Sequence, residues 1–107
     1  MLLRWPGSDP ELLPVLFISH YDIVPVTDGT EGDWTHGPFS GAVADGHLWG
    51  RGTLDVKYSV AALLEAASRM IQDGVMLRRT VMFAFGHDEE VMIGEGMGAA
   101  AADQSSC

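Results

Sequence analysis

The sequence contains little cysteine, few basic side chains and no long apolar run, and each shortage excludes a class of protein. Its single cysteine, Cys107, excludes an internal disulfide and a cysteine-rich zinc finger. Six Lys and Arg against fifteen Asp and Glu give a formal net charge of -9, which argues against a nucleic-acid-binding or anionic-membrane surface. No apolar run approaches the roughly 20 residues that span a bilayer. The opening MLLRWPGSDP lacks the apolar core of a signal peptide. We therefore expect neither a transmembrane segment nor a signal peptide in this chain, and no compartment is indicated.

What the chain does contain is typical of a folded domain. Hydrophobic residues make up 47% and charged residues 20% of its 107 residues, which is the composition of one small globular domain. The excess of acids also suits the binding of cations. Most of these acids, such as Asp9, Glu11 and Asp73, are expected to be solvated surface groups. A metal site must therefore rest on particular carboxylates.

Two short apolar runs predict core strands. Residues 15–19 (VLFIS) are typical of a strand buried on both faces, and residues 80–85 (TVMFAF) are expected to form a second core strand. Between these two runs, apolar residues recur with the period of a helix, which predicts a helix over about residues 55–73. A strand, helix and strand in this order imply a parallel pair joined by a crossover helix, and thus an α/β fold. A short strand at residues 2–5 and a β-hairpin about an Asp-Gly turn at residues 42–49 are also expected.

The predicted helix is amphipathic. Its apolar stripe consists of Val60, Leu63, Leu64, Ala67 and Ile71. Gly74 is expected to end the helix, and Glu65 and Arg69 to pair on its exposed face. Asp55 lies near the helix start, where a carboxylate can cap the helix. Alternatively Thr53 is the cap, and Asp55 points away from the helix as a ligand.

Residues 26–41 are rich in turn formers and predict a long surface loop. We expect Trp34 and Phe39 to pin this loop to the body of the domain rather than to contact a substrate. His36 and His47 are expected to be exposed. Residues 91–102 are apolar and Gly-rich, and they are expected to begin another helix.

Titratable side chains follow both predicted core strands. His20 and Asp22 end the first, and Glu89 and Glu90 follow the second. Since ligands in α/β sheets bind beyond the carboxyl ends of parallel strands, we expect both clusters to share one edge with Asp55. The spacing of His20 and Asp22 puts both on one face of extended backbone, so Asp22 can orient one imidazole nitrogen while the other binds metal. The alternative is an ordinary α/β domain in which these acids merely cap and solvate.

This set of side chains suits a metal-dependent hydrolase. Imidazole nitrogen with carboxylate oxygens is a ligand set for zinc, or for manganese or cobalt where carboxylates dominate. A metal lowers the pKa of bound water, and a neighbouring carboxylate can take the remaining proton. Of the adjacent Glu89 and Glu90, one can bind metal while the other acts as general base, but the sequence does not assign which.

Three motifs indicate a family. They are HYDIVPV at residues 20–26, W..GPFSGAVADGHLWGRGTLDVK at residues 34–57 and FAFGHDEE at residues 83–90. In this order and spacing they resemble the zinc-dependent aminoacylase and carboxypeptidase metallopeptidase family, which includes glutamate carboxypeptidase and succinyl-diaminopimelate desuccinylase. The second and third motifs are most similar to the carboxypeptidase S branch and its relatives that hydrolyse or form N-acyl amino acids. The resemblance is strongest over residues 14–100.

The resemblance implies a role for each candidate residue. His20 would be a ligand of one zinc ion and Asp22 would orient it. Asp55 would bridge two zinc ions, Glu89 would be the general base, and Glu90 would be a ligand of the second ion. The implied fold is the catalytic α/β domain of a zinc exopeptidase, an α/β/α sandwich of the phosphorylase/hydrolase-like type with an inserted dimerisation domain. The implied substrate has an amide bond next to a free carboxylate, as in a peptide C-terminus or an N-acyl amino acid.

The chain departs from the family in its extent. Family members are several-fold longer and supply a further acidic ligand and a final His from downstream sequence, whereas no His follows His87 here. We therefore expect residues 1–107 to be an N-terminal fragment of a catalytic domain, with an incomplete sandwich. A homodimer is expected of the full-length family. The alternative is a catalytically inactive truncated product or a cation-binding fragment.

Overall fold

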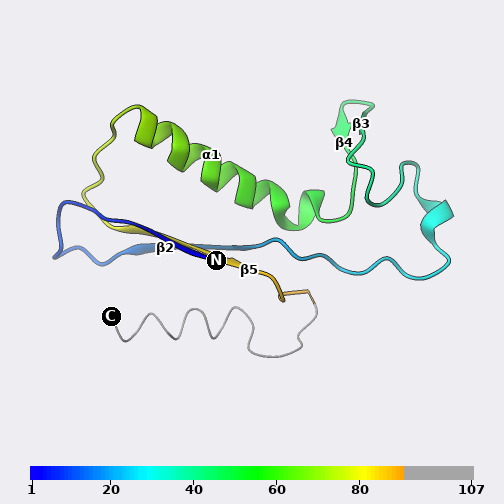
Figure 1. The fold of residues 1–107 in the computed structure, drawn as a ribbon, viewed down its shortest axis with the longest axis horizontal. Coiled ribbons are helices and arrows are strands. Elements are labelled where there is room, and N and C mark those ends of the chain that lie inside the picture. The colour runs from blue at the N-terminus through cyan, green and yellow to red at the C-terminus, as the bar shows by residue number, and fades with distance from the viewer. Residues whose placement is uncertain (91–107) are drawn as a thin grey trace.

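The computed structural model of the chain describes residues 1–90. In chain order its elements are β1 (Leu2–Trp5), β2 (Val15–His20), the 3-10 turn η1 (Glu31–Asp33), β3 (Val43–Ala44), β4 (His47–Leu48), the irregular helical turn η2 (Thr53–Lys57), α1 (Tyr58–Gln72) and β5 (Val81–Gly86). Figure 1 shows α1 lying along one side of a sheet, with the β3 and β4 hairpin beyond its amino-terminal end. The helix predicted at residues 91–102 lies outside the described residues.

The three-stranded sheet has the order β1, β5, β2. β2 runs parallel to β5 in a register that pairs Val15 with Val81 and His20 with Gly86, and β1 runs antiparallel along the other side of β5. The predicted parallel pair and the short strand at residues 2–5 are therefore confirmed. The described chain is part of an α/β domain, and the carboxyl ends of β2 and β5 lie at the same edge of its sheet.

The core is centred on β5. Phe83, Ala84 and Phe85 are buried, and the Phe83 ring stacks on Phe17 of β2 with the ring centroids 5.8 Å apart. Aromatic side chains bury large apolar areas, so these few residues supply much of the hydrophobic stabilisation. Phe17 shares a strand face with Ser19, whose hydroxyl meets α1, so this is the face that α1 covers.

The opposite face of β2 is open in the described part of the chain. Leu16 and Ile18 alternate with Phe17 and lie on the other strand face, where they keep 38% and 50% of their surface exposed, and Phe17 itself keeps 41% exposed. The prediction that residues 15–19 form a strand buried on both faces is therefore wrong for residues 1–90. The physical reason is that β2 lies at the edge of the described strands and that α1, the one α-helix among residues 1–90, lies along one side of the sheet.

The start of α1 differs from the predicted helix. α1 begins at Tyr58, because Asp55 has φ and ψ of -122° and 92° and Val56 has -143° and 30°, which are not helical values. Its end is as predicted, since Gly74 adopts the left-handed region with a φ of 68° and its N–H donates to the carbonyl of Ile71.

The face of α1 that meets the sheet is rotated relative to the predicted stripe. Leu64 and Ile71 are exposed, although the stripe included them. The half-buried side chains are instead Ser59, Val60, Leu63, Ala67 and Met70. Ser59 faces the sheet on this side of α1, where its hydroxyl makes a hydrogen bond with Ser19 of β2. The predicted pair of Glu65 and Arg69 is present at 3.4 Å.

The hairpin of β3 and β4 is confirmed, and Asp45 and Gly46 at its turn have φ values of 53° and 75°. Two positive φ values in succession are the conformation that an Asp-Gly pair favours in a two-residue turn. Within residues 1–90, no helix has the length and apolar character needed to cross a bilayer.

The side chains of the long loop follow the predictions in part. Trp34 is half-buried, and the Arg51 guanidinium lies 5.1 Å from its ring centroid, as expected of an anchor. Phe39 is 71% exposed, so the prediction that it anchors the loop is wrong. His36 is also not exposed as predicted, because its ring packs 4.9 Å from that of Trp49. His47 is exposed, as predicted.

Candidate metal centre

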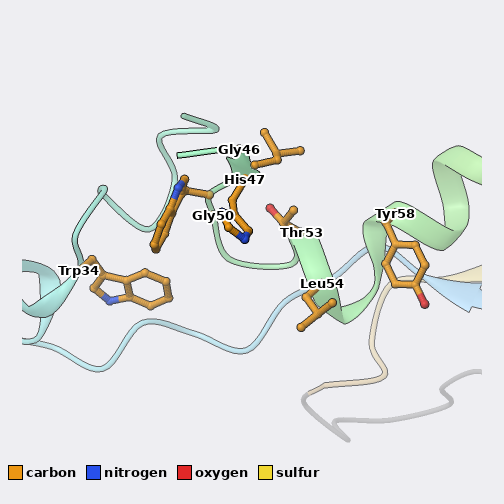
Figure 2. A pocket seen from close by; sticks show the side chains of 9 residues that line it. Trp34, Gly46, His47, Gly50, Thr53, Leu54 and Tyr58 are labelled. Carbon is orange, nitrogen blue, oxygen red and sulfur yellow. The ribbon is translucent and has the colours of Figure 1, made fainter. Parts of the chain in front are cut away.

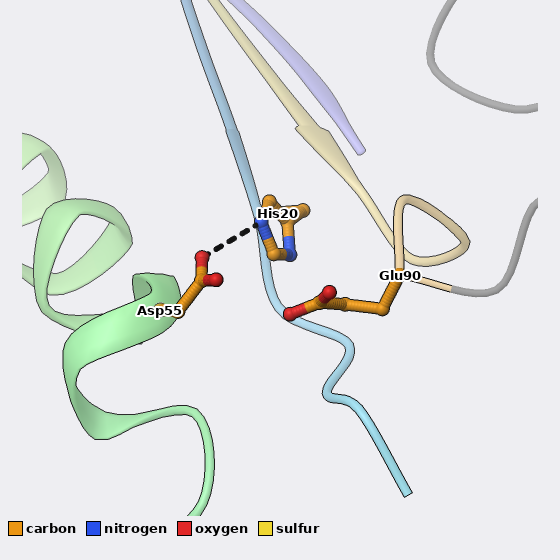
Figure 3. Close-up of side chains that lie close together, drawn as sticks. All are labelled: His20, Asp55 and Glu90. Carbon is orange, nitrogen blue, oxygen red and sulfur yellow. Dashed lines mark ion pairs between the residues drawn. The ribbon is translucent and has the colours of Figure 1, made fainter.

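Three side chains from distant parts of the chain converge beyond the carboxyl ends of β2 and β5. His20 ends β2, Asp55 belongs to η2, and Glu90 follows β5. Each offers one nitrogen or oxygen atom, and these atoms all lie within 4.8 Å of one another. Figure 3 shows the imidazole between the two carboxylates. Parallel pairing of β2 with β5 accounts for this convergence, because it brings both strand ends to one edge.

Asp55 points into this cluster and does not cap the helix. Gly52 starts η2 in the left-handed region with a φ of 78°, and neither η2 nor α1 has a side-chain hydrogen bond at its cap. The Thr53 hydroxyl is therefore not a cap either. Because the backbone at Asp55 is extended rather than helical, its carboxylate turns toward the end of β2, where Oδ1 lies 3.5 Å from Nε2 of His20.

Asp22 holds the other side of the imidazole. Its Oδ1 lies 3.2 Å from Nδ1 of His20, and its Oδ2 accepts a hydrogen bond of 2.9 Å from the backbone N–H of Glu90. Partial burial raises the pKa of the Asp22 carboxyl. The backbone N–H groups of Glu90 and of Asp22 itself, together with the nearby His20, lower this pKa by a larger amount. The resulting pKa therefore lies below the ordinary value of 3.8. Asp22 is therefore ionised at neutral pH, accepts a hydrogen bond from Glu90 and lies in contact with His20.

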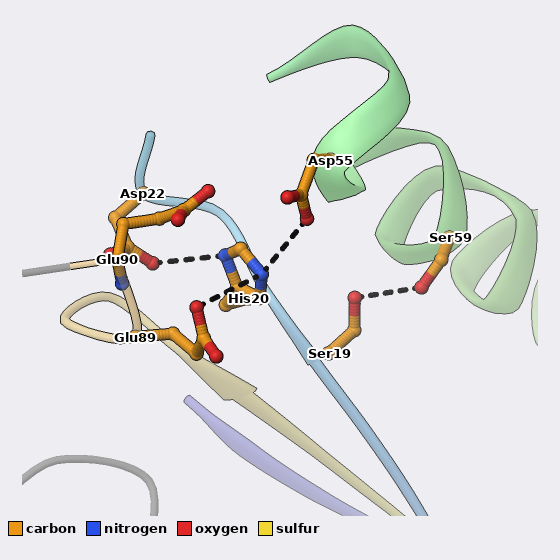
Figure 4. Close-up of polar contacts among 7 residues, drawn as sticks. All are labelled: Ser19, His20, Asp22, Asp55, Ser59, Glu89 and Glu90. Atoms are coloured by element: carbon orange, nitrogen blue, oxygen red, sulfur yellow. Dashed lines mark hydrogen bonds and ion pairs between the residues drawn. The ribbon is translucent and has the colours of Figure 1, made fainter. Parts of the chain in front are cut away.

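Glu89 is a second carboxylate that faces Nε2 of His20, together with Asp55. Oε2 of Glu89 lies 3.7 Å from Nε2 of His20 (Figure 4), and the Glu89 side chain is half exposed. Within residues 1–90 no Lys or Arg forms an ion pair with Asp55, Glu89 or Glu90. Four carboxylates, those of Asp22, Asp55, Glu89 and Glu90, lie around one buried imidazole, so the site concentrates negative charge and offers nitrogen and oxygen donors. The side chains therefore fit a divalent cation such as zinc.

The structure thus brings all five predicted site residues into one group, and the sequence missed two features around it. Ser19 and Ser59 join β2 to α1 directly beside the cluster. Arg51 lines a pocket of about 240 Å³ together with Asp55 and Glu90. The signal for Arg51 was its place between two glycines just ahead of Asp55. No sequence signal pairs Ser19 with Ser59, because side-chain hydrogen bonds between distant segments leave no periodic pattern.

The fold and the site together indicate the class of this protein. It is part of an α/β domain that carries an imidazole and carboxylate cluster beyond its parallel strands. Residues 16–105 match Peptidase family M20/M25/M40, and the chain belongs to this family. The resemblance noted from the three motifs is thereby confirmed.

Three relatives match most of the chain. It is 44% identical over 91 residues to "Probable carboxypeptidase S-like 2" of Dictyostelium discoideum, covering 85% of this chain and 17% of that protein. It is 40% identical over 92 residues to "Carboxypeptidase S" of Saccharomyces cerevisiae, covering 84% and 16%. It is 48% identical over 84 residues to "N-fatty-acyl-amino acid synthase/hydrolase PM20D1" of Homo sapiens, covering 78% and 16%. The chain thus spans 16% to 17% of the length of these relatives.

Proposed function

We propose that this chain is the N-terminal part of the catalytic domain of a zinc-dependent hydrolase, which cleaves an amide bond next to a free carboxylate. The observation that carries the proposal is the convergence of His20, Asp55 and Glu90, whose donor atoms lie within 4.8 Å of one another. Membership of the peptidase family supports it. The names of the relatives point to two substrate classes, peptides with a free C-terminus and N-acyl amino acids.

His20, Asp55 and Glu90 are the residues that would hold zinc, with cobalt or manganese as substitutes. Nε2 of His20 and the carboxylate oxygens of Asp55 and Glu90 would be the donor atoms that hold the metal. Zinc bound there would supply Lewis-acid activation of a water molecule and of the substrate carbonyl. Asp22 acts as a positioning residue, since its contact with Nδ1 leaves Nε2 facing the cluster.

We assign Glu89 as the general base and Glu90 as the ligand. The backbone N–H of Glu90 is tied to Asp22, which holds that residue in place as a ligand requires. Glu89 has no such tie among the described residues, and its carboxylate is half exposed, so it can reach a water molecule. Glu89 would accept the proton of the attacking water and deliver it to the leaving amine nitrogen.

The full fold would be an α/β/α sandwich with a phosphorylase/hydrolase-like arrangement. Support comes from the open face of the sheet, where Leu16 and Ile18 lack cover in the described part of the chain and a second layer of helices would bury them. The rest of the catalytic domain would add the missing ligands. An inserted domain would form a homodimer, as the resemblance implies.

A second function is supported by the exposure of the cluster. Asp55 keeps 74% of its side chain exposed, and His20 is the one imidazole of the cluster within residues 1–90. Such a site binds a cation more weakly than a closed set of four ligands. The second candidate is therefore a cation-binding fragment that does not hydrolyse an amide.

Calorimetric titration of the purified chain with zinc tests the metal site. Asp55→Asn should lower the zinc affinity at least about tenfold, because an amide cannot supply the charge of a bridging carboxylate. Asp73→Asn is the matched control, since Asp73 is an exposed acid at the other end of α1, and its zinc affinity should equal that of the parent. Equal affinities for all three chains would refute the site.

Hydrolysis of N-acyl amino acids by the zinc-loaded chain separates the two candidate functions. Glu89→Gln should bind zinc as the parent does and lose about 100-fold or more of the hydrolysis rate. Zinc binding with no hydrolysis by the parent would favour the cation-binding fragment.

A further inference from the structure

Arg51 is a cation beside the candidate metal centre that no described carboxylate neutralises. It lines the pocket of about 240 Å³ to which Asp55 and Glu90 also belong. Within residues 1–90 it forms no ion pair, although the chain has fifteen Asp and Glu against six Lys and Arg. Its Nε is buried and has no hydrogen-bond partner among the described residues. A buried donor without a partner is costly, so this nitrogen is suited to a ligand that accepts its hydrogen bond.

Two contacts hold Arg51 at the wall of this pocket. Its Cζ lies 5.1 Å from the centroid of the Trp34 ring, and Trp34 lines the same pocket. The backbone N–H of Arg51 donates a hydrogen bond of 2.7 Å to the carbonyl of Pro38. A guanidinium that already rests on an aromatic ring loses less conformational freedom when it binds an anion than a free side chain would. Arg51 is therefore better prepared for binding than an arginine on the open surface.

The pocket of Arg51 borders a larger and less charged one. The larger pocket has a volume of about 640 Å³, and Figure 2 shows Trp34 at one end and Tyr58 at the other, with Leu54 between them. Trp34, Gly50 and Leu54 line both pockets. Among the described residues that line the larger pocket there is no Asp, Glu, Lys or Arg. Within residues 1–90, Arg51 is therefore the one Lys or Arg that lines either pocket.

We propose that Arg51 binds the free carboxylate of the substrate and so determines that the hydrolysed amide bond lies next to such a group. This inference rests on the proposed function, to which it adds the residue that recognises the carboxylate. A planar guanidinium can donate two parallel hydrogen bonds to the two oxygens of a carboxylate. Because Arg51 and Asp55 line the same pocket, a carboxylate at Arg51 would lie only a few atoms from an amide carbonyl at the metal cluster.

The charges at the site favour this role over binding of the substrate carboxylate by the metal alone. The four carboxylates around His20 carry four formal negative charges, which equal the four positive charges of two zinc ions. A further carboxylate entering the site would then find no surplus positive charge on the ions. A buried anion needs a partner of opposite charge, and Arg51 supplies one at the same pocket.

Binding of N-acetylglycine and N-acetylglycinamide to the zinc-loaded chain tests the inference. The two ligands differ only in that a neutral amide replaces the carboxylate. The parent chain should bind N-acetylglycine about tenfold or more tightly than the amide. Arg51→Gln should bind both ligands with equal affinity, because glutamine has neither the charge nor the fork of N–H donors. Arg51→Lys should lie between the two, since it keeps the charge but not the planar fork.

A matched control and a direct signal separate this contact from a general effect of charge. Arg79→Gln removes the same charge from an exposed arginine that lines neither pocket, and it should keep the preference of the parent. In a ¹⁵N-labelled parent chain, the Nε–H signal of Arg51 is the one that is absent from Arg51→Gln. This signal should shift when N-acetylglycine is added.

Three results would overturn the inference, and a fourth would overturn the proposed function. Equal affinity of the parent for both ligands would show that the carboxylate is not recognised. A preference for N-acetylglycine that persists in Arg51→Gln would place the carboxylate at the metal or at another residue. Arg51→Gln should bind zinc at least as tightly as the parent, so a loss of zinc affinity would make Arg51 a structural support of η2. Failure of the parent to bind zinc would refute the metal centre on which both proposals rest.

Discussion

The hydroxyl groups of Ser19 and Ser59 lie 2.7 Å apart and join the end of β2 to the start of α1 across 40 residues of sequence (Figure 4). Ser19 is only 4% exposed and directly precedes His20. Ser59 follows η2, the turn that carries Asp55. This hydrogen bond therefore joins the strand that ends in His20 to the helix that follows Asp55, next to the candidate metal centre.

Ser59→Ala should destabilise the fold. It leaves the buried Ser19 hydroxyl without its partner, which costs about 1 to 3 kcal/mol in the free energy of unfolding. Urea unfolding followed by circular dichroism measures this loss. Ser68→Ala on the exposed face of α1 is the matched control and should change the stability by less than about 0.5 kcal/mol. Equal effects of both substitutions would show that the Ser19 to Ser59 bond contributes nothing.

The lowered pKa of Asp22 predicts a loss of stability in acid. Because the pKa is lower in the folded state, the contribution of Asp22 is fully present above the ordinary value of 3.8 and is lost as the pH falls through the native value. The difference in unfolding free energy between the parent and Asp22→Asn should therefore shrink as the pH drops from about 6 to below 3.8. Unfolding in the presence of EDTA removes any contribution of metal. A difference that stays constant over this range would contradict the assignment.

Gly52→Ala should be more harmful than Gly29→Ala, although both glycines have a similar positive φ of 78° and 83°. A Cβ at Gly29 would meet nothing, so the cost there is the left-handed strain of about 1 to 2 kcal/mol. A Cβ at Gly52 would collide with the side chains of Ile23 and Lys57, which adds about 1 to 3 kcal/mol. Thermal unfolding compares the two variants. Gly52→Ala should also weaken zinc binding, because it shifts η2, and equal stabilities would argue against this crowding.

The open sheet face predicts self-association of the chain. Ile18 is 50% exposed beside Leu16 on an edge strand, whereas Ile71 is 61% exposed on the outer face of α1. Ile18→Thr should raise the concentration at which sedimentation velocity detects oligomers, because it breaks an apolar patch next to unpaired strand edges. Ile71→Thr removes an equivalent exposed side chain from the helix and should have a smaller effect. The reverse order would move the association surface to α1.

The parallel strands and the convergence of His20 with Glu90 could be predicted from the sequence, because two β-branched and aromatic runs separated by a helix permit few topologies. Once the strands are parallel, the side chains that follow them must share an edge. The geometry of Asp55 could not be predicted in the same way. An Asp near a helix start is equally suited to capping and to ligation, and the choice depends on non-helical backbone angles at that residue.

The exposure of Leu16 and Ile18 was also beyond local sequence reasoning. An apolar run indicates that a strand requires burial, but it does not indicate which segment provides the cover. The half-burial of His36 could not be predicted for the same reason. Its ring packs against Trp49, which follows the second strand of the hairpin. Some segments are linked by neither a hydrophobic period nor a turn motif in the sequence. Contacts between such segments depend on the assembled fold.

β5 is the last of the described strands along the chain, yet it occupies the middle of the sheet. During synthesis β1 and β2 therefore emerge before the strand with which each of them pairs, and neither can complete its hydrogen bonds until β5 follows. Such non-local pairing is slow, and unpaired strands invite association with chaperones or with other chains. Pairing of β2 with β5 also brings Glu90 to His20. The sheet and the candidate metal centre are therefore expected to form in the same late folding step.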